Sequence, residues 1–167
     1  VVAGAPVRGA GDVLHIGALV FRPDGQTWTH TKVHVHPSEI PPFSAGSGGP
    51  PFLVAQTSVA LGICADATFA EHAAAARSHG AEVYAVGVMI DAAGYDRKTS
   101  LLEGYAREHG MAVLMANYAG VSGAEVSAGG SAVWSPDGVL AAADGNREAL
   151  VIGARDGGCW TGLVMAC

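Results

Sequence analysis

Short apolar runs recur along the chain, separated by turns rich in glycine, proline and aspartate. Runs of this length predict buried strands, whereas 69–79 and 96–109 show the patterning of helices. Strands are expected at 1–7, 13–21, 27–36, 52–58, 59–64, 83–90, 111–117, 132–135, 139–143 and 149–154. Because each predicted helix lies between two apolar strands, the middle of the chain predicts two βαβ units and a parallel sheet.

Residues at the helix ends support this interpretation. Thr68-x-x-Glu71 has the spacing of a capping box, which predicts that the first helix begins directly after Thr68. Each helix is followed by a glycine, Gly80 or Gly110, the usual residue just past a helix end. Residues 156–167 are expected to form an arm with little core of its own.

The strand expected at 27–36 alternates between two faces. Period two places Lys32 on one face together with His30, His34 and His36. Imidazoles at such spacing can bind zinc. However, neither a Cys-x-x-Cys nor a His-Glu-x-x-His motif accompanies them. A solvent-facing histidine cluster is therefore favoured, and no metal is predicted.

Cys64 lies at the end of the strand at 59–64, one tight turn before a helix. The end of a buried strand holds the thiol rigidly, and the nearby helix N-terminus favours a thiolate. The backbone N–H of Ala65 is placed to stabilise an oxyanion. Most free cysteines are simply buried small hydrophobes, so a reactive thiol requires a polar partner elsewhere.

Lys32 and Glu39 are the candidate partners of Cys64. A lysine near a thiolate stabilises it and can also stabilise a tetrahedral intermediate, and Glu39 can hold that lysine charged and oriented. The alternative is a solvated strand end with a weak surface ion pair. His72 and His79 can share a face of the following helix, but neither lies in the turn that carries the thiol.

Composition narrows the class of protein. A chain of 167 residues, half of them hydrophobic and 14% charged, is long enough for one packed domain, which we assign to 1–167. A net charge of −6 argues against binding to nucleic acid or anionic membranes. Cysteines at positions 64, 159 and 167 form no paired framework and suit a reducing, cytoplasmic compartment.

The order of these segments resembles that of the carbon–nitrogen hydrolase family, the nitrilase superfamily. The similar segments are 61–66 with 69–71 for the nucleophile, 31–34 with Glu39 for the lysine, and then 80–83, 106–109, 116–120, 129–133 and 135–138. The resemblance runs in order from residue 1 to about residue 161. It favours Cys64 as a nucleophile over Cys64 as a core thiol.

The resemblance implies a mixed α/β (α+β) fold class, an α-β-β-α sandwich, and a Glu–Lys–Cys triad without metal or organic cofactor. In such a site Cys64 attacks an amide or nitrile carbon and Lys32 stabilises the tetrahedral intermediate, with Glu39 as a further member. A second glutamate acts as base and acid, and water releases the acyl-enzyme.

Three departures from the family pattern bear on activity. The general-base glutamate of the family lies in an earlier strand–helix unit, so we expect the chain to be N-terminally incomplete. Ala65 stands where the family usually has an aromatic residue, and Gly87 stands where a proline commonly ends the strand. Both changes are expected to open the substrate pocket, which we place at Ala65, Val88 and Met89.

The predicted function is thus a cytoplasmic thiol hydrolase of non-peptide C–N bonds, an amidase acting on a small amide. Amidase is favoured over nitrilase because amide hydrolysis is the commoner activity among members with such motifs. The expected partners are a small-molecule amide or nitrile and further copies of the chain, in a homodimer or larger homo-oligomer. The alternative is a catalytically inactive member that serves as a binding or assembly module.

Overall fold

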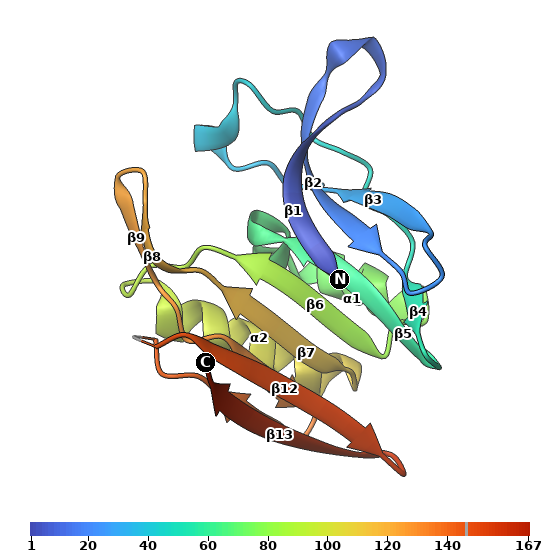
Figure 1. Cartoon of the computed structure of the whole chain (residues 1–167), viewed down its shortest axis with the longest axis vertical. Coiled ribbons are helices and arrows are strands. Elements are labelled where there is room, and N and C mark those ends of the chain that lie inside the picture. Colours follow the sequence, from blue (N-terminus) through green and yellow to red (C-terminus); the bar gives the residue numbers. More distant parts are fainter. Residues whose placement is uncertain (146) are drawn as a thin grey trace.

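The computed structural model describes residues 1–145 and 147–167 (Figure 1). Two α-helices are found in these ranges, α1 (Ala70–Ser78) and α2 (Tyr95–His109). The strands are β1 (Val2–Arg8), β2 (Leu14–Phe21), β3 (Thr27–Thr31), β4 (Phe52–Val54), β5 (Thr57–Ile63), β6 (Val83–Val88), β7 (Ala112–Asn117), β8 (Ala119–Ser122), β9 (Glu125–Ala128), β10 (Ala132–Ser135), β11 (Gly138–Ala142), β12 (Ala149–Asp156) and β13 (Cys159–Ala166). Short 3₁₀ turns lie at Ala10–Asp12 (η1), Pro37–Glu39 (η2) and Cys64–Thr68 (η3).

A six-stranded sheet of order β11-β10-β7-β6-β5-β4 forms the middle of the fold. Its strands β5, β6 and β7 are parallel and are connected by α1 and α2, which confirms the two predicted βαβ units. β4 pairs with β5 in a hairpin, and β10 and β11 extend the other side of the sheet antiparallel. The parallel arrangement brings the carboxyl ends of β5 and β6 to the same edge, where η3 begins.

The two helices cover one face of this sheet (Figure 1). The main core lies between the helices and the sheet, and it combines helix residues such as Leu102 and Tyr105 with sheet residues such as Tyr84 and Val113. Leu102 and Tyr105 lie on the buried side of α2, which is followed by Gly110 with a left-handed backbone.

The opposite face of the sheet carries a second layer of strands. β1, β2 and β3 form an antiparallel sheet that packs Ala18 and Val20 against Leu61 of β5. The β12–β13 hairpin lies against β10 and β11, across the same face (Figure 1). The described residues therefore build α-β-β layers, in agreement with the predicted mixed fold class, and they contain one helical layer.

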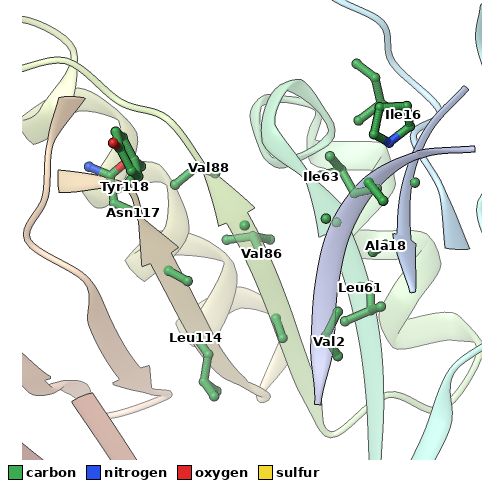
Figure 2. A pocket seen from close by; sticks show the side chains of 18 of the residues that line it. Val2, Ile16, Ala18, Leu61, Ile63, Val86, Val88, Leu114, Asn117 and Tyr118 are labelled. Atoms are coloured by element: carbon green, nitrogen blue, oxygen red, sulfur yellow. The ribbon is translucent and has the colours of Figure 1, made fainter. Parts of the chain in front are cut away.

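Much of the sheet face between these two groups of strands is uncovered. A hydrophobic cavity of about 840 Å³ lies between β1–β2 and strands β5, β6 and β7, and Figure 2 shows Val2, Leu61 and Leu114 around it. A second cavity of about 730 Å³ continues toward β12–β13, where Trp160 lines it. We call these two cavities together the open groove.

Three sequence predictions are wrong in detail. The strand expected at 27–36 ends at Thr31. The N–H of Lys32 still donates to the Ile16 carbonyl of β2, but those of Val33 and His34 donate to the side chain of Asp66. Thr68 does not cap α1, since its hydroxyl donates to the carbonyl of Ala65 at 2.8 Å. The arm expected at 156–167 instead forms β13, which pairs with β12 along its whole length.

Candidate active site

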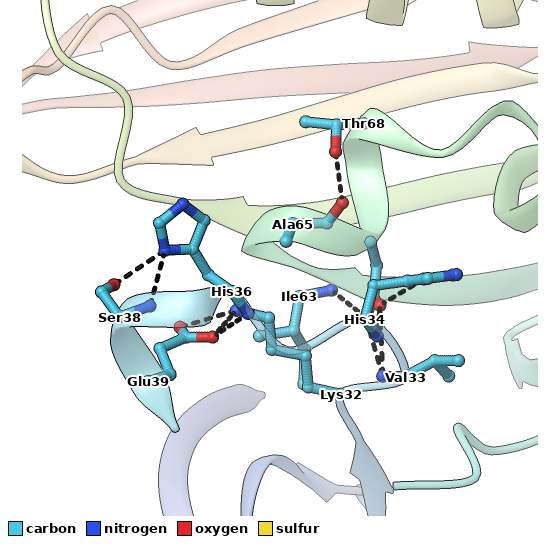
Figure 3. Close-up of polar contacts among 10 residues, drawn as sticks. Lys32, Val33, His34, His36, Ser38, Glu39, Ile63, Ala65 and Thr68 are labelled. Carbon is cyan, nitrogen blue, oxygen red and sulfur yellow. Dashed lines mark hydrogen bonds and ion pairs between the residues drawn. The ribbon is translucent and has the colours of Figure 1, made fainter. Parts of the chain in front are cut away.

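Cys64 follows β5 directly and opens the 3₁₀ turn η3. Its backbone has φ of 49°, a left-handed conformation that is unusual for a residue with a side chain and that recurs at functional sites. The residue is partly exposed. The hydrogen bond from Thr68 to the Ala65 carbonyl closes the same turn (Figure 3). The thiol is thus held on a tight, constrained turn, as the sequence predicts.

Asp66 joins this turn to the segment that follows β3. Its carboxylate is completely buried and accepts backbone N–H bonds from Ile63 at 3.1 Å, His34 at 2.7 Å and Val33 at 3.1 Å. Buried carboxylates require such partners, since an unpaired one is strongly destabilising. Asp66 therefore fixes the position of the segment containing Lys32 relative to Cys64.

Lys32 and Glu39 form a tight ion pair. Nζ of Lys32 lies 2.7 Å from both carboxylate oxygens of Glu39, and the lysine side chain is fully buried while that of Glu39 is 23% exposed. Glu39 also accepts the backbone N–H of His36 at 2.7 Å, which closes the η2 turn (Figure 3). The alternative of a solvated strand end is wrong, because the side chain of Lys32 is fully buried. A buried ammonium of this kind needs its carboxylate.

A small cavity of about 270 Å³ brings together several predicted site residues. Cys64, Ala65, Val88 and Met89 all line it, and so does His36. Arg97 and Lys98, at the start of α2, add positive charge to its wall. This volume lies just below the usual range for ligand pockets, which run from about 300 to 1,000 Å³. The cavity thus suits a small substrate.

The cavity does not bring every predicted residue together. Among the described residues that line it, none carries a carboxylate. Glu39 is connected to it through the bond with the backbone of His36, a lining residue. Lys32 is connected to the Cys64 turn through Asp66, which holds the two residues after Lys32.

The histidines of segment 27–36 do not share one face. His36 bonds through Nδ1 to Ser38 at 2.7 Å, whereas His30 and His34 approach Asp66. His34 Nδ1 lies 3.1 Å from Asp66, and its ring stacks on Phe69. The zinc site considered at His30, His34 and His36 is therefore not assembled.

Asp66 and His72 are not among the site residues that the sequence predicts. His72 of α1 lies with its Nε2 3.9 Å from Asp66, so three histidines surround one buried carboxylate. Burial is the main cause that lowers the pKa of His30 to about 4 and also lowers the pKa of His72, although Asp66 opposes both shifts. The signal for Asp66 was available, because an aspartate within an apolar segment must find partners.

No described helix is both long and apolar enough to cross a membrane.

Comparison with known proteins finds a protein family and similar solved structures. A model of the carbon-nitrogen hydrolase family matches residues 1–160. No curated protein matches the chain. Among solved structures, Nit3 of Saccharomyces cerevisiae, a member of branch 10 of the nitrilase superfamily, is 22% identical with a TM-score of 0.79, over 87% of this chain and 55% of that one.

Two further structures have similar folds. A carbon-nitrogen hydrolase from Helicobacter pylori G27 is 22% identical with a TM-score of 0.77, over 88% of this chain and 58% of its own. A mutant of the amidase from Nesterenkonia sp. AN1, with acrylamide added to its active-site cysteine, is 27% identical with a TM-score of 0.76, over 87% of this chain and 59% of that one. This chain thus spans less than three fifths of each of these structures. The chain belongs to the carbon–nitrogen hydrolase family.

Proposed function

We propose that this protein is a thiol hydrolase of non-peptide C–N bonds, an amidase that acts on small amides through an acyl-enzyme on Cys64. The observation that carries the proposal is the link through Asp66, which fixes the constrained Cys64 turn against the segment of the Lys32–Glu39 ion pair. The similar Nesterenkonia amidase, solved with acrylamide on its active-site cysteine and with butyramide, supports amides as the substrate class.

The proposed reaction uses the thiolate of Cys64 as the nucleophile. The sulfur attacks the amide carbon, and the carbonyl oxygen becomes an oxyanion that Lys32 and the backbone N–H of Ala65 stabilise. The C–N bond then breaks, and ammonia leaves with the proton that the general base took from the thiol. Water hydrolyses the thioester and releases the carboxylic acid. Glu39 keeps Lys32 charged and oriented for this role, through both of its carboxylate oxygens.

The reaction also needs a general base, and no described residue lining the small cavity carries a carboxylate. We propose that a further segment of the polypeptide supplies the glutamate and that this segment occupies the open groove. The apolar lining of the groove and the fraction of the neighbouring structures that this chain spans support this assignment. Without the base, the rate is expected to fall by about 10²–10⁴-fold.

The test is ammonia release from butyramide. We expect slow release by the protein and none by Cys64→Ala, with Cys159→Ala as a control that keeps the wild-type rate. Equal release by wild type and Cys64→Ala would exclude this thiol as the nucleophile. The alternative is an inactive family member that serves as a binding module, and it predicts that butyramide binds without being hydrolysed.

Self-association and a cytoplasmic location are further parts of the proposal. Leu150, Leu163, Val164 and Met165 are exposed on the β12–β13 hairpin, an apolar surface of the kind that subunit interfaces cover. Three free cysteines and no disulfide among the described residues suit a reducing compartment. Light scattering after size exclusion tests the first point, with a dimer or larger species expected. A monomer at micromolar concentration would contradict it.

A further inference from the structure

His30, Asp66 and His72 form a cluster that the proposed amidase chemistry does not use. Each residue offers one ligand atom, and these atoms lie within 4.8 Å of one another. The three come from β3, η3 and α1, so the cluster lies where these elements meet. His30 is 3% exposed, Asp66 is fully buried, and the side chain of His72 is 13% exposed.

His30 carries a buried nitrogen without a partner. Its Nε2 is inaccessible and has no hydrogen bond to any residue that the structure describes, although the residue is polar and almost completely buried. An orphaned polar atom of this kind destabilises a fold. Burial also keeps the ring neutral, because it lowers the pKa of His30 well below the ordinary value. A neutral imidazole is the form that binds metal ions.

His72 is oriented by a bond on its other nitrogen. Nδ1 lies 2.9 Å from the hydroxyl of the fully buried Tyr84. When Nδ1 donates this bond, the lone pair resides on Nε2, which is the atom 3.9 Å from the Asp66 carboxylate. Metal-binding histidines usually have such a partner, since it fixes the tautomer and the ring orientation.

The spacing is compatible with a small shift on binding. Atoms at the corners of a triangle with 4.8 Å sides lie about 2.8 Å from its centre. Zinc binds imidazole nitrogen and carboxylate oxygen at about 2.0–2.2 Å, so each atom would move inward by less than about 1 Å. His34 keeps Asp66 in place from the other side, at 3.1 Å from its second oxygen.

We propose that His30, Asp66 and His72 bind a divalent transition-metal ion of the zinc type. Two imidazole nitrogens and one carboxylate oxygen suit zinc, and they leave a fourth tetrahedral position for water. The ion satisfies the orphaned Nε2 of His30 and cross-links the end of β3 to α1 through Asp66. Its role is to stabilise the Cys64 turn through Asp66, and it takes no part in the bond-breaking steps.

The experiment is zinc binding to protein that has first been treated with EDTA. We expect about one zinc per chain by elemental analysis after gel filtration, together with a rise in melting temperature that grows with zinc concentration. His72→Asn is expected to lose both effects. His79→Asn is the matched control, because His79 lies one heptad further along the chain, is exposed and bonds only to the Ala75 carbonyl in the described structure.

A milder variant separates metal binding from folding. Tyr84→Phe keeps all three ligands and removes only the hydroxyl that orients His72, so zinc affinity should fall by about 10–100-fold while circular dichroism stays native. Co²⁺ substitution identifies the donors, since nitrogen and oxygen ligands give no thiolate charge-transfer band. Zinc bound equally by His72→Asn and His79→Asn, a Co²⁺ spectrum with a thiolate band, or no bound zinc would each overturn the proposal.

Discussion

Replacement of Asp66 by alanine tests the structural basis of the site. The carboxylate accepts backbone N–H bonds from Ile63, His34 and Val33, and all three donors lose their partner in Asp66→Ala. Each orphaned, partly buried donor destabilises the fold by about 1 kcal/mol or more, so the free energy of unfolding should fall by at least about 3 kcal/mol. This is a large share of the stability of a typical domain, which is about 5–15 kcal/mol.

Urea denaturation in EDTA, followed by circular dichroism, measures this loss without any contribution from bound metal. Asp24→Ala is the matched control. Asp24 also accepts a backbone N–H, that of Gln26 at 3.0 Å, but at an exposed turn where water replaces the carboxylate. Its effect should be below about 1 kcal/mol. Equal losses in Asp66→Ala and Asp24→Ala would refute the assignment of Asp66 as the link between the two segments.

Three other predictions concern the ion pair, the packing behind the turn and the dependence on pH. Glu39→Gln leaves the buried Lys32 ammonium without its carboxylate. Urea denaturation should show a loss of about 2–4 kcal/mol in the free energy of unfolding. An unchanged denaturation midpoint would contradict the burial of the pair. Gly62→Ala places a methyl group 2.9 Å from the ring of Tyr84. The melting temperature should fall by an amount that corresponds to a loss of about 1–3 kcal/mol in the free energy of unfolding. An unchanged melting temperature would show that the ring can move aside. In EDTA, the unfolded chain takes up a proton at His30 near the ordinary pKa of 6.5, whereas the folded protein does so only near a pKa of 4. The free energy of unfolding should therefore fall as the pH drops from 6.5 to 4, by at most about 3 kcal/mol. His30→Gln should flatten this dependence, and a variant with the same slope as wild type would contradict the shift.

The parts of the fold that depend on local patterns could be predicted from the sequence. The apolar runs and the glycine after α2 predict the parallel strands β5, β6 and β7 and the second helix closely, because continuous apolar runs bounded by turns and helices leave a clear pattern. The early end of β3 could not be predicted, since the competing acceptor is the side chain of Asp66, far away in the sequence. The period-two sequence pattern continues after Thr31, but from Val33 on the backbone N–H groups bond to Asp66 and not to β2.

The site was predictable to a similar extent. The resemblance to the family predicts Cys64 as the nucleophile and Ala65, Val88 and Met89 at the substrate pocket. All four line one cavity because they lie where two neighbouring parallel strands end. The pairing of Lys32 with Glu39 follows from a turn only a few residues long. The histidine cluster was not predictable, because His72 joins it from α1 while His36 turns away to bond Ser38. Tertiary packing, and not spacing along a strand, selects its members.

The central claim is that Cys64 is an activated nucleophile, and site-resolved alkylation tests it most directly. The protein is treated with limiting iodoacetamide at neutral pH, and the modified cysteines are mapped by mass spectrometry. Cys159 and Cys167 are exposed while Cys64 is only partly so, which means that accessibility alone favours the other two. We expect Cys64 to be modified first and Lys32→Met to remove this preference. Modification of Cys159 and Cys167 ahead of Cys64 would contradict it.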